Sequence, residues 1–230
     1  MFYPSFMRVF LLHGMARTAA SMLILSRRLK AVGHSSSLFG YHVTVSELEG
    51  IATRLVERVR EVMADDAARE GVPEGSLPYA IVGHSLGNVI ARLASPRLPA
   101  GLSHMVMLAP PNRSPIAARY LEDNPIFRLL TRDAGQKLAD PGFFASLPRP
   151  EVPILVIAGV RGPSVSWLPF EGRTNDCVVA LEETHLEGAP TLEVDGIHTF
   201  LMNRKDVAEA IRKFLAGETV EAAEVAANTG

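Results

Sequence analysis

The segment that decides the fold is PYAIVGHSLGN, residues 78–88. Its first five residues form a short apolar run that predicts a buried strand, and a helical pattern follows from about Asn88 to Ala94. Ser85 lies between them, in the turn from strand to helix. The glycines two positions to either side, Gly83 and Gly87, lack the Cβ atoms that would collide with the strand and the helix. The sequence therefore predicts a tight turn that presents the Ser85 hydroxyl as a nucleophile.

Strands and helices alternate along the rest of the chain. The expected strands are residues 8–12, 37–41, 78–82, 105–109, 154–158 and 191–194, and the expected helices are 21–32, 46–68, 88–94 and 206–215. Ser46 followed by Glu49 has the form of a capping box at the start of the longest helix. This alternation predicts an α/β fold with a mostly parallel central sheet of about six strands and helices on both faces.

The segment from Asn112 to Pro150 breaks the alternation, because five prolines cut it into short pieces. Two interpretations remain open: a packed excursion that covers an edge of the sheet, or a cap over an active site. We expect residues 1–230 to form a single domain with this cap-like insert at about 112–150. Residues 217–230 are acidic and alanine-rich without an apolar face, so we expect them to fray.

Composition excludes several classes of protein. The chain has 230 residues with 23 Lys+Arg and 25 Asp+Glu, so a net charge of −2 leaves no strong positive field for nucleic acid. The single cysteine, Cys177, cannot form an intramolecular disulfide, and the seven histidines show no spacing typical of a metal site. No apolar run is long enough to span a membrane, and the amino terminus lacks the pattern of a signal peptide. We therefore expect a cytoplasmic protein without a transmembrane segment.

A serine hydroxyl becomes a good nucleophile only when a base removes its proton and a carboxylate orients that base. His198 follows the last predicted strand, and Asp176 follows the strand 154–158 across a loop rich in Gly, Pro and Ser. Both loops belong at the carboxyl edge of the sheet, where Ser85 is also expected. The competing carboxylates are Glu182, Glu183 and Asp195. The remaining histidines, predicted to be ordinary surface residues, are His34, His42, His104 and His185.

Four motifs together resemble the α/β-hydrolase superfamily: His13-Gly14-Met15, Gly83-His84-Ser85-Leu86-Gly87, Asn175-Asp176-Cys177-Val178-Val179 and Gly196-Ile197-His198. Within it, the short chain and the early first strand resemble small bacterial lipases and esterases with a reduced core. The resemblance implies Ser85, Asp176 and His198 as catalytic residues. It also implies that the backbone N–H groups of Met15 and Leu86 form the oxyanion hole.

The resulting expectation is a serine hydrolase that cleaves carboxylic esters and needs neither a metal nor a cofactor. The partner would be a small-molecule ester with an apolar acyl chain. Side chains expected near the substrate are Met15, Leu86, some of Ile116, Leu121, Ile126 and Phe127, and the motif histidines His13 and His84. Two alternatives stay open: a thioesterase or acyltransferase with the same triad, and a non-catalytic ligand-binding protein on the same fold. The sequence does not indicate an oligomeric state.

Overall fold

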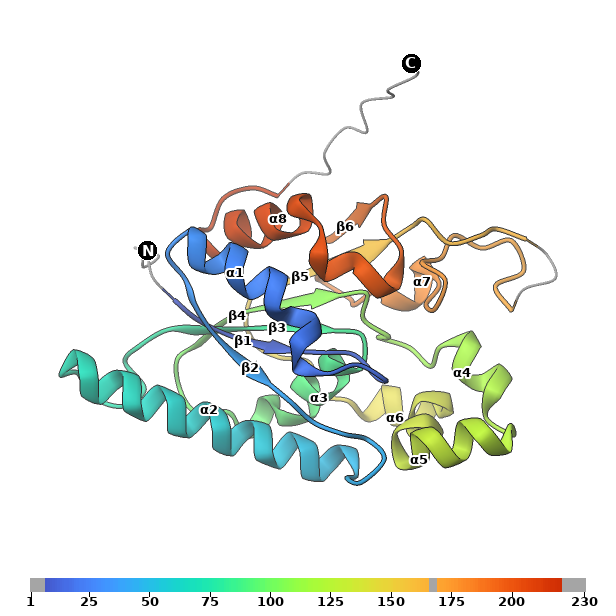
Figure 1. The fold of residues 1–230 in the computed structure, drawn as a ribbon, viewed down its shortest axis with the longest axis horizontal. Helices are drawn as coiled ribbons and strands as arrows, with labels where there is room; N and C mark the ends of the chain where they lie inside the picture. The colour runs from blue at the N-terminus through green and yellow to red at the C-terminus, as the bar shows by residue number, and fades with distance from the viewer. Residues whose placement is uncertain (1–6, 166–168, 221–230) are drawn as a thin grey trace, which may run out of the picture.

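The computed structural model describes residues 7–165 and 169–220. Within them, six strands form one parallel sheet in the order β2-β1-β3-β4-β5-β6 (Figure 1). The strands are β1 (Arg8–Leu12), β2 (Ser35–Phe39), β3 (Tyr79–His84), β4 (Leu102–Leu108), β5 (Ile154–Gly159) and β6 (Thr191–Val194). The predicted fold class is confirmed. Most of the segment predicted to fray, residues 221–230, lies outside the described residues.

Helices cover both faces of the sheet, as the alternation predicted. The helices are η1 (Ala19–Met22), α1 (Leu23–Ala31), α2 (Leu48–Glu70), α3 (Leu86–Ala94), η2 (Ser95–Arg97), α4 (Ile116–Leu121), α5 (Pro125–Ala139), α6 (Pro141–Ser146), α7 (Leu181–Thr184), η3 (His198–Asn203) and α8 (Lys205–Leu215). Figure 1 shows α1 and α8 on one face and α2 and α3 on the other. The sheet is therefore the middle layer of a three-layer arrangement.

Strand β1 shows how the core is divided. Phe10 and Leu12 belong to the apolar cluster on the side of α2 and α3, whereas Val9 and Leu11 belong to the cluster on the side of α1 and α8. All four side chains are fully buried. Because successive side chains of a strand point to opposite faces, a continuous apolar run is what a central parallel strand needs.

The longest helix is present where it was predicted, but the predicted capping box is wrong. Helix α2 begins at Leu48, and the side chain of Ser46 accepts a hydrogen bond from Arg54 rather than capping the helix. The N–H of Leu48 instead donates to the Asp133 carboxylate of α5, at 3.0 Å. A residue 85 positions away thus supplies the acceptor that the local sequence was expected to supply.

Two of the four histidines predicted to lie on the surface are buried. His104 lies on β4 with its ring edge-on to Phe214 of α8, at 5.2 Å between centroids, and His34 lies just before β2. Burial lowers the pKa of both imidazoles. For His104 the surface prediction failed because the ring that packs against it, Phe214, comes from the far end of the chain. His42 and His185 are exposed, as expected.

The segment 112–150 forms the three short helices α4, α5 and α6. Figure 1 shows them gathered beyond the end of the sheet toward which the strands run. We refer to residues 116–146 as the cap. Several of its apolar side chains are exposed: Tyr120, Leu121, Ile126, Leu129 and Leu130. No helix among the described residues combines the length and the apolar character needed to cross a membrane.

Candidate active site

Ser85 occupies the turn between β3 and α3 in a strained backbone conformation. Its φ of 52° and ψ of −120° lie in a region that residues with a side chain rarely adopt. The turn is held on both sides, because the N–H of Ser85 donates to the carbonyl of Leu108 at 2.9 Å and its carbonyl accepts from the N–H of Asn88 at 3.0 Å. The side chain remains partly exposed.

The two flanking glycines are required by close approach of backbone atoms. A Cβ atom on Gly83 would lie 2.9 Å from the backbone nitrogen of Asn88, and one on Gly87 would lie 2.8 Å from the carbonyl oxygens of Leu12 and His13. Neither neighbour is a flexible side-chain tip that could move aside. The steric reason predicted for this glycine spacing is therefore confirmed.

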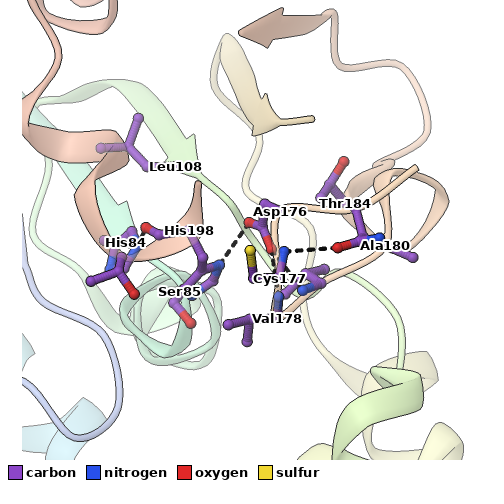
Figure 2. Close-up of polar contacts among 12 residues, drawn as sticks. His84, Ser85, Leu108, Asp176, Cys177, Val178, Ala180, Thr184 and His198 are labelled. Atoms are coloured by element: carbon purple, nitrogen blue, oxygen red, sulfur yellow. Dashed lines mark hydrogen bonds and ion pairs between the residues drawn. The ribbon is translucent and has the colours of Figure 1, made fainter. Parts of the chain in front are cut away.

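Asp176 and His198 are joined directly. The Nδ1 of His198 lies 2.7 Å from the Oδ2 of Asp176, and the backbone N–H of His198 donates to the carbonyl of Asp176 at 2.8 Å (Figure 2). Asp176 lies in the loop after β5, and His198 is the first residue of η3, after β6. Because a carboxylate only accepts, Nδ1 carries the proton, which leaves Nε2 free to act as a base.

The environment of Asp176 fixes its orientation. Its other oxygen, Oδ1, accepts from the backbone N–H groups of Val178 and Val179 at 3.0 and 2.8 Å, and the residue is 1% exposed. A Cβ atom on Gly159, the last residue of β5, would lie 3.0 Å from the Cβ of Asp176. The carboxylate is therefore held in place by the sheet edge and by its own turn.

Two of the three competing carboxylates are engaged elsewhere in the described structure, and the third, that of Asp195, makes no contact with His198 there. Glu182 lies 3.4 Å from Arg173, and Glu183 accepts from the backbone N–H groups of Ile116 and Ala180. Asp195 contributes its backbone carbonyl to Arg204. Of the four candidates, the structure brings only Asp176 to His198.

Ser85 lies beside His198 in Figure 2, on the side of the imidazole away from Asp176. No direct hydrogen bond joins the Ser85 hydroxyl to His198 in the described structure. Such bonds are often long without substrate and tighten in the substrate complex. The three side chains come from three loops at the same sheet edge, in the order Ser, Asp, His along the chain.

His84, one of the residues expected near the substrate, is buried beneath the loop of His198. It is 1% exposed, its Nε2–H donates to the carbonyl of His198 at 3.0 Å, and the two rings lie 4.8 Å apart. Burial holds the pKa of His84 well below its usual value. As the last residue of β3, it points into the interior and supports the loop of His198.

His13 fixes the peptide that follows it. Its Nδ1–H donates to the carbonyl of Gly14 at 2.8 Å, and its Nε2 accepts from the N–H of Tyr41 at 3.3 Å. The ring stacks on Tyr41 at 4.1 Å, and the Tyr41 hydroxyl donates to the carbonyl of His13. Sequence reasoning missed Tyr41, since nothing local connects it to a motif 28 residues away.

Two backbone N–H groups near Ser85 have fixed orientations, one set by His13 and the other by the start of α3. The carbonyl of Gly14 and the N–H of Met15 belong to one peptide plane and point in opposite directions. Fixing the carbonyl on His13 therefore fixes the Met15 N–H on the opposite side. Leu86 is the first residue of α3, where N–H groups have no partner within the helix and the helix dipole is positive.

A cavity of about 520 Å³ begins at this segment and extends under the cap. The predicted contact residues that line it are His13, Met15, Leu121, Ile126 and Phe127. It is lined further by Gly14, Ala16, Arg17, Tyr41, His42, Val43, Thr44, Asn124, Leu130 and Thr131. Leu86 does not line it, because it is buried in the core, and Ile116 borders a different cavity. The lining is mostly apolar and contains no carboxylate.

No three His, Cys, Asp or Glu side chains gather in a way that could hold a metal ion within residues 7–165 and 169–220. Cys177, next to Asp176, is exposed and forms no disulfide.

Comparison with known proteins gives structural matches only. No protein-family model matches the sequence, and no curated protein matches it either. The mature lipase BlEst2 from Bacillus licheniformis superposes with a TM-score of 0.71 at 15% identity, covering 94% of each chain. The chain has the α/β-hydrolase fold.

Two further solved structures agree with this α/β-hydrolase assignment. The metagenomic carboxyl esterase MGS0156 matches 94% of this chain and 77% of its own, with a TM-score of 0.61 at 16% identity. An extracellular α/β-hydrolase from a Paenibacillus species matches 94% and 100%, with a TM-score of 0.51 at 15% identity. The chain spans 54% of the longer propeptide form of the Bacillus lipase. The structural neighbours thus include lipases and esterases.

Proposed function

We propose that this protein is a serine hydrolase that cleaves carboxylic esters through an acyl-enzyme on Ser85. The observation that carries the proposal is the buried pair of Asp176 and His198, 2.7 Å apart, beside a serine in a strained turn. A protein that only binds a ligand needs neither the strain nor the pair. The lipase and esterase neighbours support the same reaction class.

In the first half of the reaction, the Nε2 of His198 takes the proton from the Ser85 hydroxyl as its oxygen attacks the ester carbonyl. Asp176 stabilises the imidazolium that forms and keeps the ring in the required tautomer. The tetrahedral intermediate then collapses, and His198 gives the proton to the departing alcohol. Ser85 is left as an ester of the acyl group.

In the second half, a water molecule takes the place of the alcohol. His198 removes a proton from the water, the resulting oxygen attacks the acyl-Ser85 ester, and the proton returns to the Ser85 oxygen. The products are the carboxylic acid and the free enzyme. No group beyond the three side chains and water is needed for this balance.

The backbone N–H groups of Met15 and Leu86 are the proposed oxyanion hole. Each such donor is typically worth about 3 kcal/mol in the transition state, and a donor whose orientation is fixed in advance costs no reorganisation. His13 and Tyr41 give Met15 this fixed orientation, and the start of α3 gives it to Leu86.

The apolar cavity under the cap is the proposed site for the acyl chain. Ile126, Phe127 and Leu130 line it from the cap, and Tyr41 and Val43 line it from the sheet side. An apolar chain fits such a surface better than a sugar or a peptide.

The test is hydrolysis of 4-nitrophenyl esters from acetate to palmitate by the wild type, Ser85→Ala and Ser76→Ala. Ser76 is an exposed serine before the amino end of β3, at the opposite end of this strand from Ser85, so it is the matched control. Turnover by the wild type and Ser76→Ala that disappears in Ser85→Ala is the expected result. Equal turnover by all three proteins would reject Ser85 as the nucleophile.

A further inference from the structure

Arg17 lies two residues after the proposed oxyanion donor Met15 and lines the cavity. Its guanidinium donates to the backbone carbonyl of Thr199 at 2.8 Å and lies over the ring of Phe200, 5.9 Å from the centroid. Thr199 directly follows His198. Arg17 therefore connects the cavity to the loop that carries the proposed base.

The charge of Arg17 has no carboxylate beside it. No Asp or Glu lies within ion-pair distance of it among the described residues, and none lines the cavity. By contrast, Arg204 and Arg212 on the surface pair with Asp206 and Glu209. A guanidinium has five N–H donors, and the Thr199 carbonyl occupies one side of it. The remaining donors are available to an anionic group of a bound molecule.

The position of Arg17 indicates which part of an ester would carry that group. In the proposed reaction His198 protonates the departing alcohol, so the alcohol leaves on the side of the His198 loop. The acyl chain extends instead toward the apolar residues of the cap. Arg17 lines the same cavity, but its guanidinium contacts Thr199, the residue next to His198, and this contact puts the charge on the alcohol side.

We propose that Arg17 selects esters whose alcohol part carries a phosphate or carboxylate group, joined to an apolar acyl chain. The inference rests on the proposed function and adds the charge of the substrate to it. The guanidinium binds the anion through charge-assisted hydrogen bonds, which are stronger when the site excludes water. The substrate class is therefore an anionic amphiphile.

The experiment compares esters that share one acyl chain and differ in the charge of the alcohol. The substrates are 1-octanoylglycerol, 1-octanoylglycerol 3-phosphate and octanoylcholine, each used as monomers in solution, with octanoate release as the measurement. For the wild type, kcat/KM should be about ten- to hundredfold higher for the phosphate ester than for the neutral one. The cationic choline ester should be the poorest substrate, and added salt should reduce the difference.

Two variants at position 17 test whether Arg17 causes the preference for the phosphate ester over the neutral ester. Arg17→Gln should lower kcat/KM for the phosphate ester at least tenfold more than for the neutral ester, whereas Arg17→Lys should retain part of the preference. Arg28→Gln is the matched control. Arg28 donates to the carbonyl of Asn203, at the other end of η3, and does not line the cavity, so its loss should leave the preference intact.

Several results would reject the inference. Equal hydrolysis of the neutral and phosphate esters by the wild type would reject it. This comparison does not depend on whether Arg17→Gln folds. Equal loss on both substrates in Arg17→Gln would show that the Thr199 contact only supports the loop. A preference for mono-4-nitrophenyl suberate over 4-nitrophenyl octanoate, without one for the phosphate ester, would place the anion on the acyl side instead.

Different results would reject the role of Arg17 and the proposed function. Hydrolysis that depends on Ser85 but ignores alcohol charge would leave the serine hydrolase in place and reject the role of Arg17. Absence of hydrolysis of every ester, or hydrolysis that persists in Ser85→Ala, would reject both.

Discussion

The sheet edge that carries Ser85, Asp176 and His198 and the cap that faces it are built in opposite ways. At the edge, the polar side chains of Asp176 and His198 are buried and hydrogen-bonded to each other. In the cap, large apolar side chains are in water: Ile126 and Leu129 are 67% and 68% exposed.

The difference follows from what holds each region in place. At the edge, backbone atoms approach so closely that a single methyl group does not fit at Gly83 or Gly87. The cap is anchored by buried side chains such as Leu138 and Phe144, which belong to the main apolar core, and by the Glu183 carboxylate on the N–H of Ile116. Its exposed apolar side chains take no part in this packing. We therefore expect substitutions at the edge to affect chemistry and stability strongly, and substitutions of the exposed cap side chains to affect mainly substrate preference.

The largest expected effect is that of Asp176→Asn. The amide cannot stabilise the imidazolium and favours the wrong tautomer of His198, so kcat should fall about 10⁴-fold. Initial rates on a 4-nitrophenyl ester measure this. Asp195→Asn is the matched control, because Asp195 lies at the same edge and engages Arg204 through its backbone carbonyl. A comparable loss in the control would mean that the triad has been assigned to the wrong carboxylate.

Substitution of glycines should show the steric constraint directly. Gly87→Ala places a methyl group 2.8 Å from two carbonyl oxygens and should lower the free energy of unfolding by about 1–3 kcal/mol. Gly50→Ala, in α2 with no heavy atom within 4 Å of the new Cβ, should instead raise it by about 0.5–1 kcal/mol. Urea unfolding of both variants tests the pair. If both variants lost stability equally, the close packing around the serine turn would not be the cause.

Buried histidines should make the protein less stable in mild acid. Burial lowers the pKa values of His13, His34, His84 and His104 below the usual 6.5. Below about pH 6.5 the unfolded chain therefore takes up protons that the folded chain refuses, so the free energy of unfolding falls as pH falls. Each histidine contributes about 1.4 kcal/mol per unit of pKa difference.

The measurement is urea unfolding of the wild type and His34→Gln between pH 8 and 5. The variant should lose stability less steeply below pH 6.5, and above pH 7 the two curves should run parallel. His34 is far from the site and suits this test because it leaves the catalytic edge unaltered. Curves that stay parallel over the whole range would exclude His34 as a contributor.

The smallest effects on stability should come from the cap. Leu130 is 59% exposed and lines the cavity, so Leu130→Ser should raise KM for octanoyl and longer esters a few-fold with less than about 0.5 kcal/mol change in stability. Leu129→Ser is the matched control, since Leu129 is 68% exposed on the same helix but does not line the cavity. Equal KM changes in both variants would argue against the cavity as the acyl site.

The sequence by itself determined the alternation of strands and helices and the serine turn. The spacing of apolar residues and the residues that end a helix or strand are local properties of the sequence. A continuous apolar run such as residues 8–12 predicts a strand buried on both faces. The Gly83-to-Gly87 spacing likewise predicted a tight turn from five residues, although the atoms that a Cβ on Gly87 would meet belong to Leu12 and His13. The placement of Asp176 and His198 in loops after β5 and β6 followed from the same alternation.

Only the tertiary structure decided features whose partners lie far apart in the chain. Asp133 caps α2 across 85 residues, Tyr41 holds His13 across 28, and Arg17 reaches Thr199 across 182. His84 was expected near substrate and is buried under the His198 loop, and Asp176 was one of four candidate carboxylates until geometry separated them. A sequence pattern reports the conformation of its own segment, whereas hydrogen-bond partners and burial depend on which segments the fold brings together.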